Sequence, residues 1–159
     1  MKKLLALLLA VVLCFSLCAC GATQNLNVTD LEKSLEGQSG VLDIEYSGKT
    51  IKKFTYIIEN VDTQKLSDKN FCEKAFYEVL SGNPTSLTYS DFMSMGVFVS
   101  LMSIVNLLYN SEEFNAIQYT EEMLSIICDG NTQKYNDWSV SAEKDEVNNS
   151  VTIVVVWDK

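Results

Sequence analysis

The sequence predicts an α+β domain: a four-stranded antiparallel sheet with helices packed on one of its faces. Two observations lead to this prediction. Apolar and polar residues alternate within 41–60 and again within 138–157, as they do in half-buried strands. Between these regions, residues 67–128 show the three- and four-residue spacing of helices. The order is therefore a short helix, two strands, three helices and two strands, a segregation that is typical of α+β proteins.

The N-terminal part of the predicted domain is a short helix followed by a β-hairpin. Thr29-Asp30-Leu31-Glu32 matches a capping box, and Gly37 ends a helix of about two turns. The hairpin pairs residues 41–47 with 50–60, and one of its faces is apolar. Lys52 is in line with the apolar residues of the second strand, but it lies near the end of the strand, where its aliphatic stem can pack on apolar residues while the ammonium group stays in water. The alternating apolar residues are Leu42, Ile44, Tyr46, Phe54, Tyr56 and Ile58.

Three helices are predicted in the middle of the chain. The first begins at a Ser67 cap and runs to about Ser81, where Gly82-Asn83-Pro84 stops it. The second lies within the uncharged stretch 92–111. The third begins at Ser111-Glu112-Glu113, whose acids favour the positive end of the helix dipole, and Gly130 follows its last turn.

The uncharged stretch is long enough to suggest a membrane span. Polar and small residues recur along it, however, and most of them fall on one helical face, which would be costly in lipid. A span would also separate the two pairs of strands. We therefore expect a buried central helix. The recurring residues are Ser94, Gly96, Ser100, Ser103, Asn106 and Asn110.

Two further strands are predicted at the end of the chain. Trp138, Val140 and Ala142 alternate with polar residues, and a turn around 147–149 follows them. Residues 151–157 are the most β-prone segment of the chain, with one strongly apolar face and a second face that is partly covered. This last strand is expected in the centre of the sheet.

Residues 1–21 have the regions of an export signal. Lys2 and Lys3 precede an apolar run at 4–17, which at about 1.5 Å per residue is too short to cross a hydrocarbon core of about 30 Å. The following Leu17-Cys18-Ala19-Cys20 resembles the lipobox of bacterial lipoproteins. That resemblance implies diacylglyceryl attachment to Cys20, cleavage after Ala19, and a lipid-anchored protein of the cell membrane that faces outside the cytoplasm. Residues 20–28 would form a tether, and residues 29–159 a single globular domain.

The charge of the mature chain is strongly negative. Without Lys2 and Lys3, ten lysines stand against 21 acidic residues, a formal difference of −11, and the sequence contains no Arg and no His. Such a surface repels nucleic acid, so nucleic-acid binding is excluded. A cationic protein or peptide is the kind of partner that the charge favours, although a net charge also serves solubility alone.

Cys72 and Cys128 are the two cysteines of the predicted domain. Both lie in apolar helical patterns, where a free thiol packs well as a small hydrophobic group. Outside the cytoplasm a disulfide between them is equally acceptable, and closing the loop from 72 to 128 would contribute on the order of 4 kcal/mol in the chain-entropy model. The sequence leaves both alternatives open.

Groups that support catalysis are scarce. Without His and Arg, most hydrolase mechanisms lose their general base or their anion clamp, and no metal or cofactor motif occurs. We therefore expect a binding protein of the envelope rather than an enzyme, with no catalytic, metal or cofactor site. One alternative is a small envelope hydrolase that uses carboxylates such as Asp43, Glu45 and Glu112. The other is a binder of a small apolar ligand, lined by the methionines at 93, 95 and 102.

The lipidation prediction depends on one sulfur atom. Cys20→Ser removes the acyl acceptor, so we expect the precursor to stay unlipidated and uncleaved at Ala19. Cys18→Ser is the matched control and should be processed normally, because the residue at that position remains small. Incorporation of radioactive palmitate, followed by membrane fractionation, measures both variants. Equal labelling of the two would show that the lipid is attached elsewhere.

Overall fold

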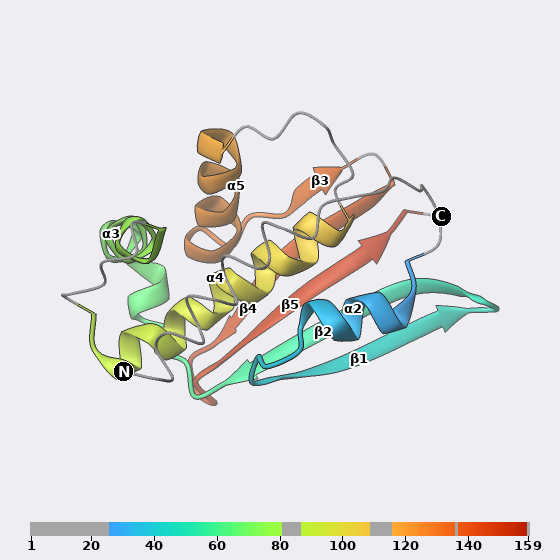
Figure 1. The fold of residues 1–159 in the computed structure, drawn as a ribbon, viewed down its shortest axis with the longest axis horizontal. Helices are drawn as coiled ribbons and strands as arrows, with labels where there is room; N and C mark the ends of the chain where they lie inside the picture. The colour runs from blue at the N-terminus through green and yellow to red at the C-terminus, as the bar shows by residue number, and fades with distance from the viewer. Residues whose placement is uncertain (1–25, 81–86, 109–115, 136, 159) are drawn as a thin grey trace.

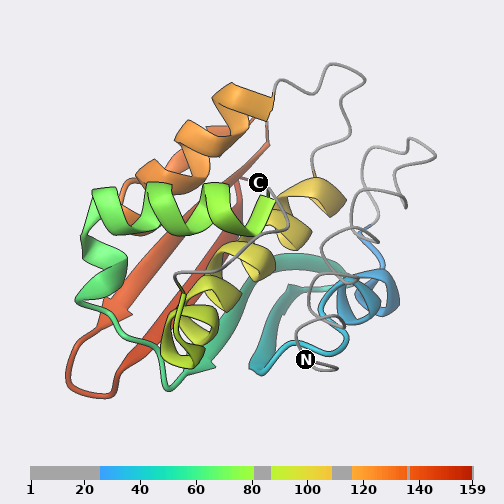
Figure 2. The ribbon, with the colours of Figure 1, turned by 60° about the vertical axis from the view of Figure 1, so that its left-hand side comes forward.

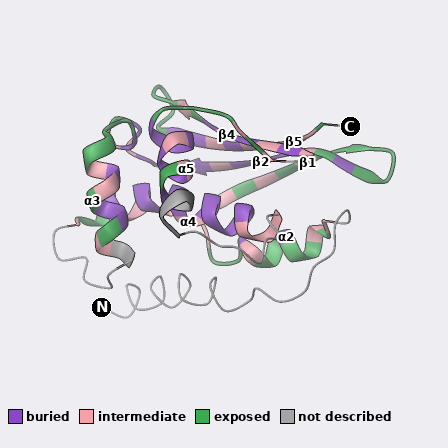
Figure 3. Cartoon of the chain, turned by 90° about the horizontal axis from the view of Figure 1, so that it is seen from above, coloured by how far each residue is buried: buried purple, intermediate pink, exposed green. Residues whose placement is uncertain are grey.

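Four α-helices lie on one face of a five-stranded antiparallel sheet in the part of the chain that the computed structural model describes, residues 26–80, 87–108, 116–135 and 137–158 (Figure 3). The α+β class is therefore as predicted. The predictions for the signal peptide at 1–19, for Cys20, for the helix stop at 82–84 and for the acidic pair at 112–113 lie outside these residues.

The strands are arranged in the order β1-β2-β5-β4-β3 (Figure 1). The third helix of the layer, α4, lies over the middle of the sheet, with α2 on one side of it and α3 and α5 on the other (Figures 1 and 2). Along the chain the elements are α2 (Val28–Ser34), β1 (Gly40–Ser47), β2 (Thr50–Glu59), the 3₁₀ turn η1 (Lys65–Ser67), α3 (Lys69–Leu80), α4 (Tyr89–Leu108), α5 (Ala116–Cys128), β3 (Gln133–Tyr135), β4 (Trp138–Asp145) and β5 (Ser150–Trp157).

The strand β3 corrects the predicted four-stranded sheet, which is wrong in the number of strands. It pairs with β4 at the edge of the sheet, and the Tyr135 ring stacks on Trp138 with the ring centroids 4.1 Å apart. A strand of three residues is too short to show an alternation of apolar and polar side chains. The sequence pattern therefore did not indicate it.

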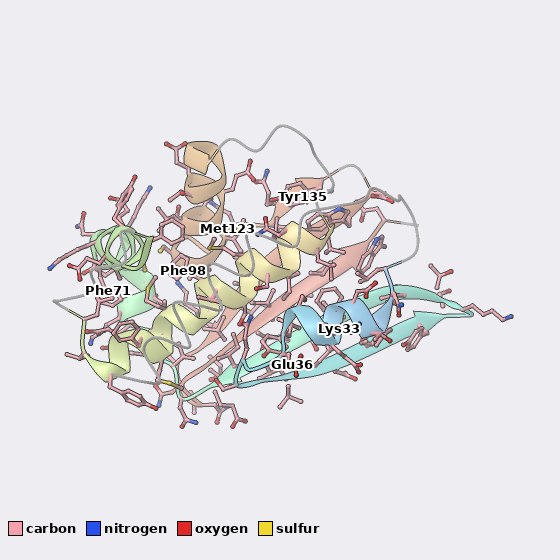
Figure 4. The ribbon with its side chains drawn as sticks, viewed as in Figure 1. Lys33, Glu36, Phe71, Phe98, Met123 and Tyr135 are labelled. Carbon is pink, nitrogen blue, oxygen red and sulfur yellow. The ribbon has the colours of Figure 1, made fainter. Side chains whose placement is uncertain are left out.

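The last strand, β5, lies in the centre of the sheet, which confirms the position expected for the most β-prone segment. It pairs antiparallel with β2 on one side and with β4 on the other. Val151, Ile153 and Val155 are fully buried beneath the helices. The side chains of Phe98 from α4 and Met123 from α5, labelled in Figure 4, complete this core and are also buried.

A β-bulge in the first hairpin changes the place expected for Lys52. Glu45 pairs with Lys53, but Tyr46 pairs with Ile51, so Lys52 has no partner in the ladder. A bulge shifts the side-chain alternation by one residue. Ile51 therefore reaches the buried face with 8% exposure, and Lys52 is exposed rather than aligned with the apolar residues.

Gly40 at the start of β1 lies against the ring of Tyr56. The Gly40 N–H donates a hydrogen bond of 2.8 Å to the Tyr56 hydroxyl oxygen, and a Cβ atom at Gly40 would overlap the ring. Tyr56 is 2% exposed, and this burial raises the pKa of its hydroxyl although the Gly40 N–H acts in the opposite direction. The close approach requires glycine at this position.

The short first helix begins two residues earlier than its predicted capping box implies. Asn27 is the N-cap, and its side chain accepts a hydrogen bond of 3.0 Å from the Thr29 N–H. Asn is at least as good a cap as Thr because its side-chain oxygen reaches the same backbone donors. The last residues of the predicted tether therefore belong to α2, whose Leu31 and adjoining Leu35 are buried in the core.

Helix α4 is a buried central helix, as expected. By length and composition it is apolar enough to cross a membrane, a test that the core helix of a folded domain also passes, and 61% of its most apolar window is buried. On the predicted polar face the three serines are buried and have partners, Gly96 and Asn106 are half-buried, and Asn110 lies outside the described residues. Ser94 accepts a hydrogen bond of 3.1 Å from the Asp62 N–H, and Ser100 and Ser103 bond to the Gln38 side chain. These bonds give the buried serines partners within the protein.

An ion pair fixes the N-terminus of α4, which begins at Tyr89 and not at 92. The Asp91 carboxylate accepts hydrogen bonds of 2.7 Å from the Thr88 N–H and hydroxyl, and a bond of 2.5 Å from the Lys65 ammonium of η1. Burial by itself would raise the pKa of Asp91, but these donors outweigh it and hold the pKa at about 2. This pair joins η1 to α4.

The contact between Gly40 and Tyr56 predicts an unusual sensitivity to a single methyl group. Gly40→Ala should destabilise the domain by about 1–3 kcal/mol, because the ring must move and its hydrogen bond is lost. Gly96→Ala is the matched control: a Cβ at this α4 position meets nothing within 4 Å, and the change should stabilise the helix by up to about 1 kcal/mol. Urea unfolding of both variants measures the difference. Equal effects of the two substitutions would contradict the role of Gly40.

The Asp91 ion pair predicts a specific loss of stability in acid. The folded-state pKa of about 2 lies below the usual 3.8, so the pair stabilises the fold above pH 4 and loses its contribution as the pH falls towards 2. Asp91→Asn should cost about 1–3 kcal/mol at pH 7 and flatten the pH dependence between 4 and 2. Denaturant unfolding at several pH values checks this. Asp43→Asn, at an exposed position, is the control, and an Asp91→Asn variant with an unchanged acid profile would contradict the assignment.

Candidate functional site

The face of the sheet opposite the helices is covered by none of the described helices (Figure 3). We call it the open face. Its side chains alternate with the buried ones along four strands, and the strand register sets them side by side. The open face consists of Val41, Asp43 and Glu45 from β1, Lys53, Thr55 and Ile57 from β2, Thr152, Val154 and Val156 from β5, and Ser139, Ser141 and Glu143 from β4.

The middle of the open face is uncharged. Thr55 pairs with Val154, and Val154 pairs with Ser141, so one row across three strands carries a methyl-rich strip bordered by hydroxyl groups. These side chains are half-buried by their neighbours. Ile57 and Val156 extend the strip along the strands. The strip can therefore make apolar contacts with a bound partner, and its hydroxyl groups can form hydrogen bonds with that partner.

Acidic residues border the uncharged strip on two sides. Asp43 on β1 and Glu143 on β4 are exposed. Glu45 forms an ion pair of 3.5 Å with Lys53. The register adds Lys134, opposite Ser139, and the acids Glu59 and Asp145, which both pair with Ser150. Carboxylates therefore outnumber ammonium groups on this face, which has a negative balance. A cationic group that approaches it meets a favourable field at both borders.

The carboxylates that the sequence suggested for catalysis do not form a close acid pair in the described residues. Asp43 and Glu45 share a strand face, as their spacing predicted, but both are exposed and Glu45 is engaged by Lys53. On α5, Glu121 is exposed, and Glu122 accepts a hydrogen bond of 3.1 Å from the Tyr135 hydroxyl. Across the described residues, His, Cys, Asp and Glu form no group of three or more that could hold a metal ion.

The methionines suggested as the lining of an apolar ligand site belong to the core. Met95 and Met102 are 2% and 8% exposed and are part of the main hydrophobic cluster. Met93, on the same helix, is half-buried. Flexible thioether side chains commonly fill such gaps.

The structure brings Cys72 and Cys128 together. Cys72 lies in α3 and Cys128 is the last residue of α5; both are buried thiols. Each is the strongest influence on the other: a hydrogen bond between them raises the pKa of Cys72 and lowers that of Cys128. The two cysteines are free thiols in this structure, and the alternatives that the sequence left open, a disulfide or two buried thiols, both remain predictions.

The open face was not among the features predicted from the sequence. The sequence indicates it in the strand segments 55–57 and 152–156, where the outward positions hold Thr, Ile and Val instead of the charged residues usual on a solvated face. The ion pair between Lys65 and the buried Asp91 was also missed, because the two residues are far apart along the chain and no sequence pattern links them.

No family model, curated protein sequence or solved structure matches this chain. Its function is therefore inferred from its own residues.

Proposed function

We propose that the mature chain is a lipid-anchored binding domain of the bacterial cell envelope, which faces outside the cytoplasm and docks a cationic protein or peptide on the open face. The lipobox-like Leu17-Cys18-Ala19-Cys20 supports the anchor. The formal charge of −11 after cleavage supports a cationic partner.

The observation that carries this proposal is the uncharged strip with acidic borders. Apolar and hydroxyl side chains in the middle of an interface supply contact area, while charged groups at its rim speed encounter and set orientation. Asp43 and Glu143 occupy the two borders, on β1 and on β4. A partner with apolar or small residues between flanking lysines or arginines is complementary to this arrangement.

The anchor would keep the domain close to the membrane. Residues 21–26 separate the Cys20 acyl site from the Asn27 cap of α2. Even fully extended, so short a segment spans only about 20–25 Å. The partner would therefore be a membrane-proximal protein or a peptide that reaches the membrane surface, and the negative domain would be repelled by anionic lipid headgroups.

A binding role agrees better with the residue chemistry than a catalytic role. The sequence has no His and no Arg, so an enzyme of this chain would depend on carboxylates, lysines or thiols. Asp43 and Glu45 are exposed to solvent, and Glu45 is held in an ion pair by Lys53. Neither the carboxylate hydrolase nor the apolar-ligand binder has an observation of its own in its favour.

Charge reversal on the open face provides the test. In the full-length, detergent-solubilised protein, Asp43→Lys combined with Glu143→Lys should slow association with a lysine-rich peptide about tenfold or more at low salt. The matched control is Glu32→Lys combined with Glu36→Lys, two exposed residues at α2 that carry the same total charge. Association rates from surface plasmon resonance measure both double variants.

The association rate of the control should fall much less, because its substitutions change only the long-range electrostatic field and not the docking surface. The difference between the two double variants should shrink at 1 M salt, where the Debye length falls to about 3 Å. Equal losses in both would mean that the net charge acts alone and that the open face is not the docking surface.

A further inference from the structure

The buried thiol pair lies at the contact between two helices that pack against each other, α3 and α5 (Figure 2). Cys72 is in the first turn of α3, and its sulfur also points to the backbone carbonyls of Lys65 and Leu66, at 3.6 and 3.7 Å. Cys128 ends α5. The two thiols therefore form a pair between the helices.

The two cysteine residues differ in exposure. Cys72 is fully buried, whereas Cys128 is 8% exposed and is followed by the exposed Asp129 and Gly130. Gly130 has a positive φ of 69°, as expected at the end of a helix. Both cysteines lie near helix ends, which open more easily than helix interiors, but Cys72 is also held by the carbonyls of Lys65 and Leu66. A small molecule in solvent therefore reaches Cys128 before it reaches Cys72.

The two sulfur atoms also differ in electrostatic surroundings. The Lys144 ammonium donates a hydrogen bond of 2.9 Å to the Cys128 carbonyl oxygen, which holds a positive charge beside the end of α5. The hydrogen bond from Cys72, together with Lys144 and Lys69, lowers the pKa of Cys128, although burial acts against this. A thiolate is the nucleophile in disulfide exchange, so Cys128 is the more reactive of the two.

We propose that Cys72 and Cys128 form an intramolecular disulfide by exchange with a small-molecule disulfide, with Cys128 attacking first and Cys72 closing the bond. In the first step the Cys128 thiolate attacks one sulfur of glutathione disulfide and expels one glutathione thiolate. In the second step the Cys72 thiolate attacks the Cys128 sulfur and expels the second. The two protons of the dithiol pass to the two glutathione thiolates, and the domain loses two electrons to the glutathione disulfide.

The bond would join α3 directly to α5 and enclose α4 within its loop. Its persistence in cells rests on the proposed location outside the cytoplasm, because reducing compartments keep such pairs as thiols. Its formation in solution does not depend on location. Failure of the exchange therefore leaves the docking proposal intact, and failure of docking leaves the exchange intact.

The test uses the reduced full-length protein, incubated with glutathione disulfide, alkylated and cleaved after lysine. Cleavage separates the two cysteines, since Cys72 falls in the peptide 70–74 and Cys128 in 75–134. We expect these two peptides to be linked, with a mass lower by two hydrogens. Cys72→Ser, or Cys72→Ala if the serine variant folds poorly, should instead accumulate a glutathione adduct at Cys128.

The reciprocal variant is the control. It distinguishes a first attack by Cys128 from a reaction in which either thiol attacks equally well because the two are close together. Cys128→Ser should form an adduct at Cys72 about tenfold more slowly or not at all, because Cys72 has no exposed surface. Comparable adduct formation at Cys72 would overturn the assigned order. Unlinked peptides in the unsubstituted protein, with both cysteines alkylated after full incubation, would overturn the disulfide itself.

Discussion

The burial of α4 is the constraint on which the rest of the structure depends. Asp91 is the one charged residue among its 20 residues, so nearly its whole surface must be shielded from water. The sheet covers one side, and α2, α3 and α5 contact the others. Since every helix is needed around α4, all described helices gather on one side of the sheet, and the opposite side is left as the open face.

The same constraint explains the polar contacts of the helix layer. A serine buried without a partner would cost about 1–3 kcal/mol. Gln38, in the connection between α2 and β1, serves both Ser100 and Ser103, while the backbone N–H of Asp62 serves Ser94. These bonds fix the positions at which the first helix and the η1 segment meet α4. The polar residues thus specify the arrangement that the apolar contacts stabilise.

Much of this fold could be predicted from residue periodicity, because strands and amphipathic helices repeat over several residues. The hairpin, the central place of β5 and the buried character of α4 are of this kind. The features that were missed depend on single residues or on distant partners. Asn27 and Thr29 are both suitable caps, and the bulge at Lys52 shifts the strand alternation by only one residue, so the sequence does not distinguish these alternatives. The strand β3 is too short to show a pattern. No sequence pattern links Gln38 to α4, or places Cys72 beside Cys128.

The central position of β5 also bears on the order in which the sheet is assembled during synthesis. Of the described strands, β5 is translated last, yet it is the only link between the β1–β2 hairpin and the β4–β3 pair. Until residues 150–157 emerge, each half has an unpaired edge and no shared core. The pairing of β2 with β5 closes a loop of most of the domain, which makes it a slow, long-range step. Under the proposed export, the chain would cross the membrane before this step in a form that has not yet folded, and the helices would acquire their sheet on the far side.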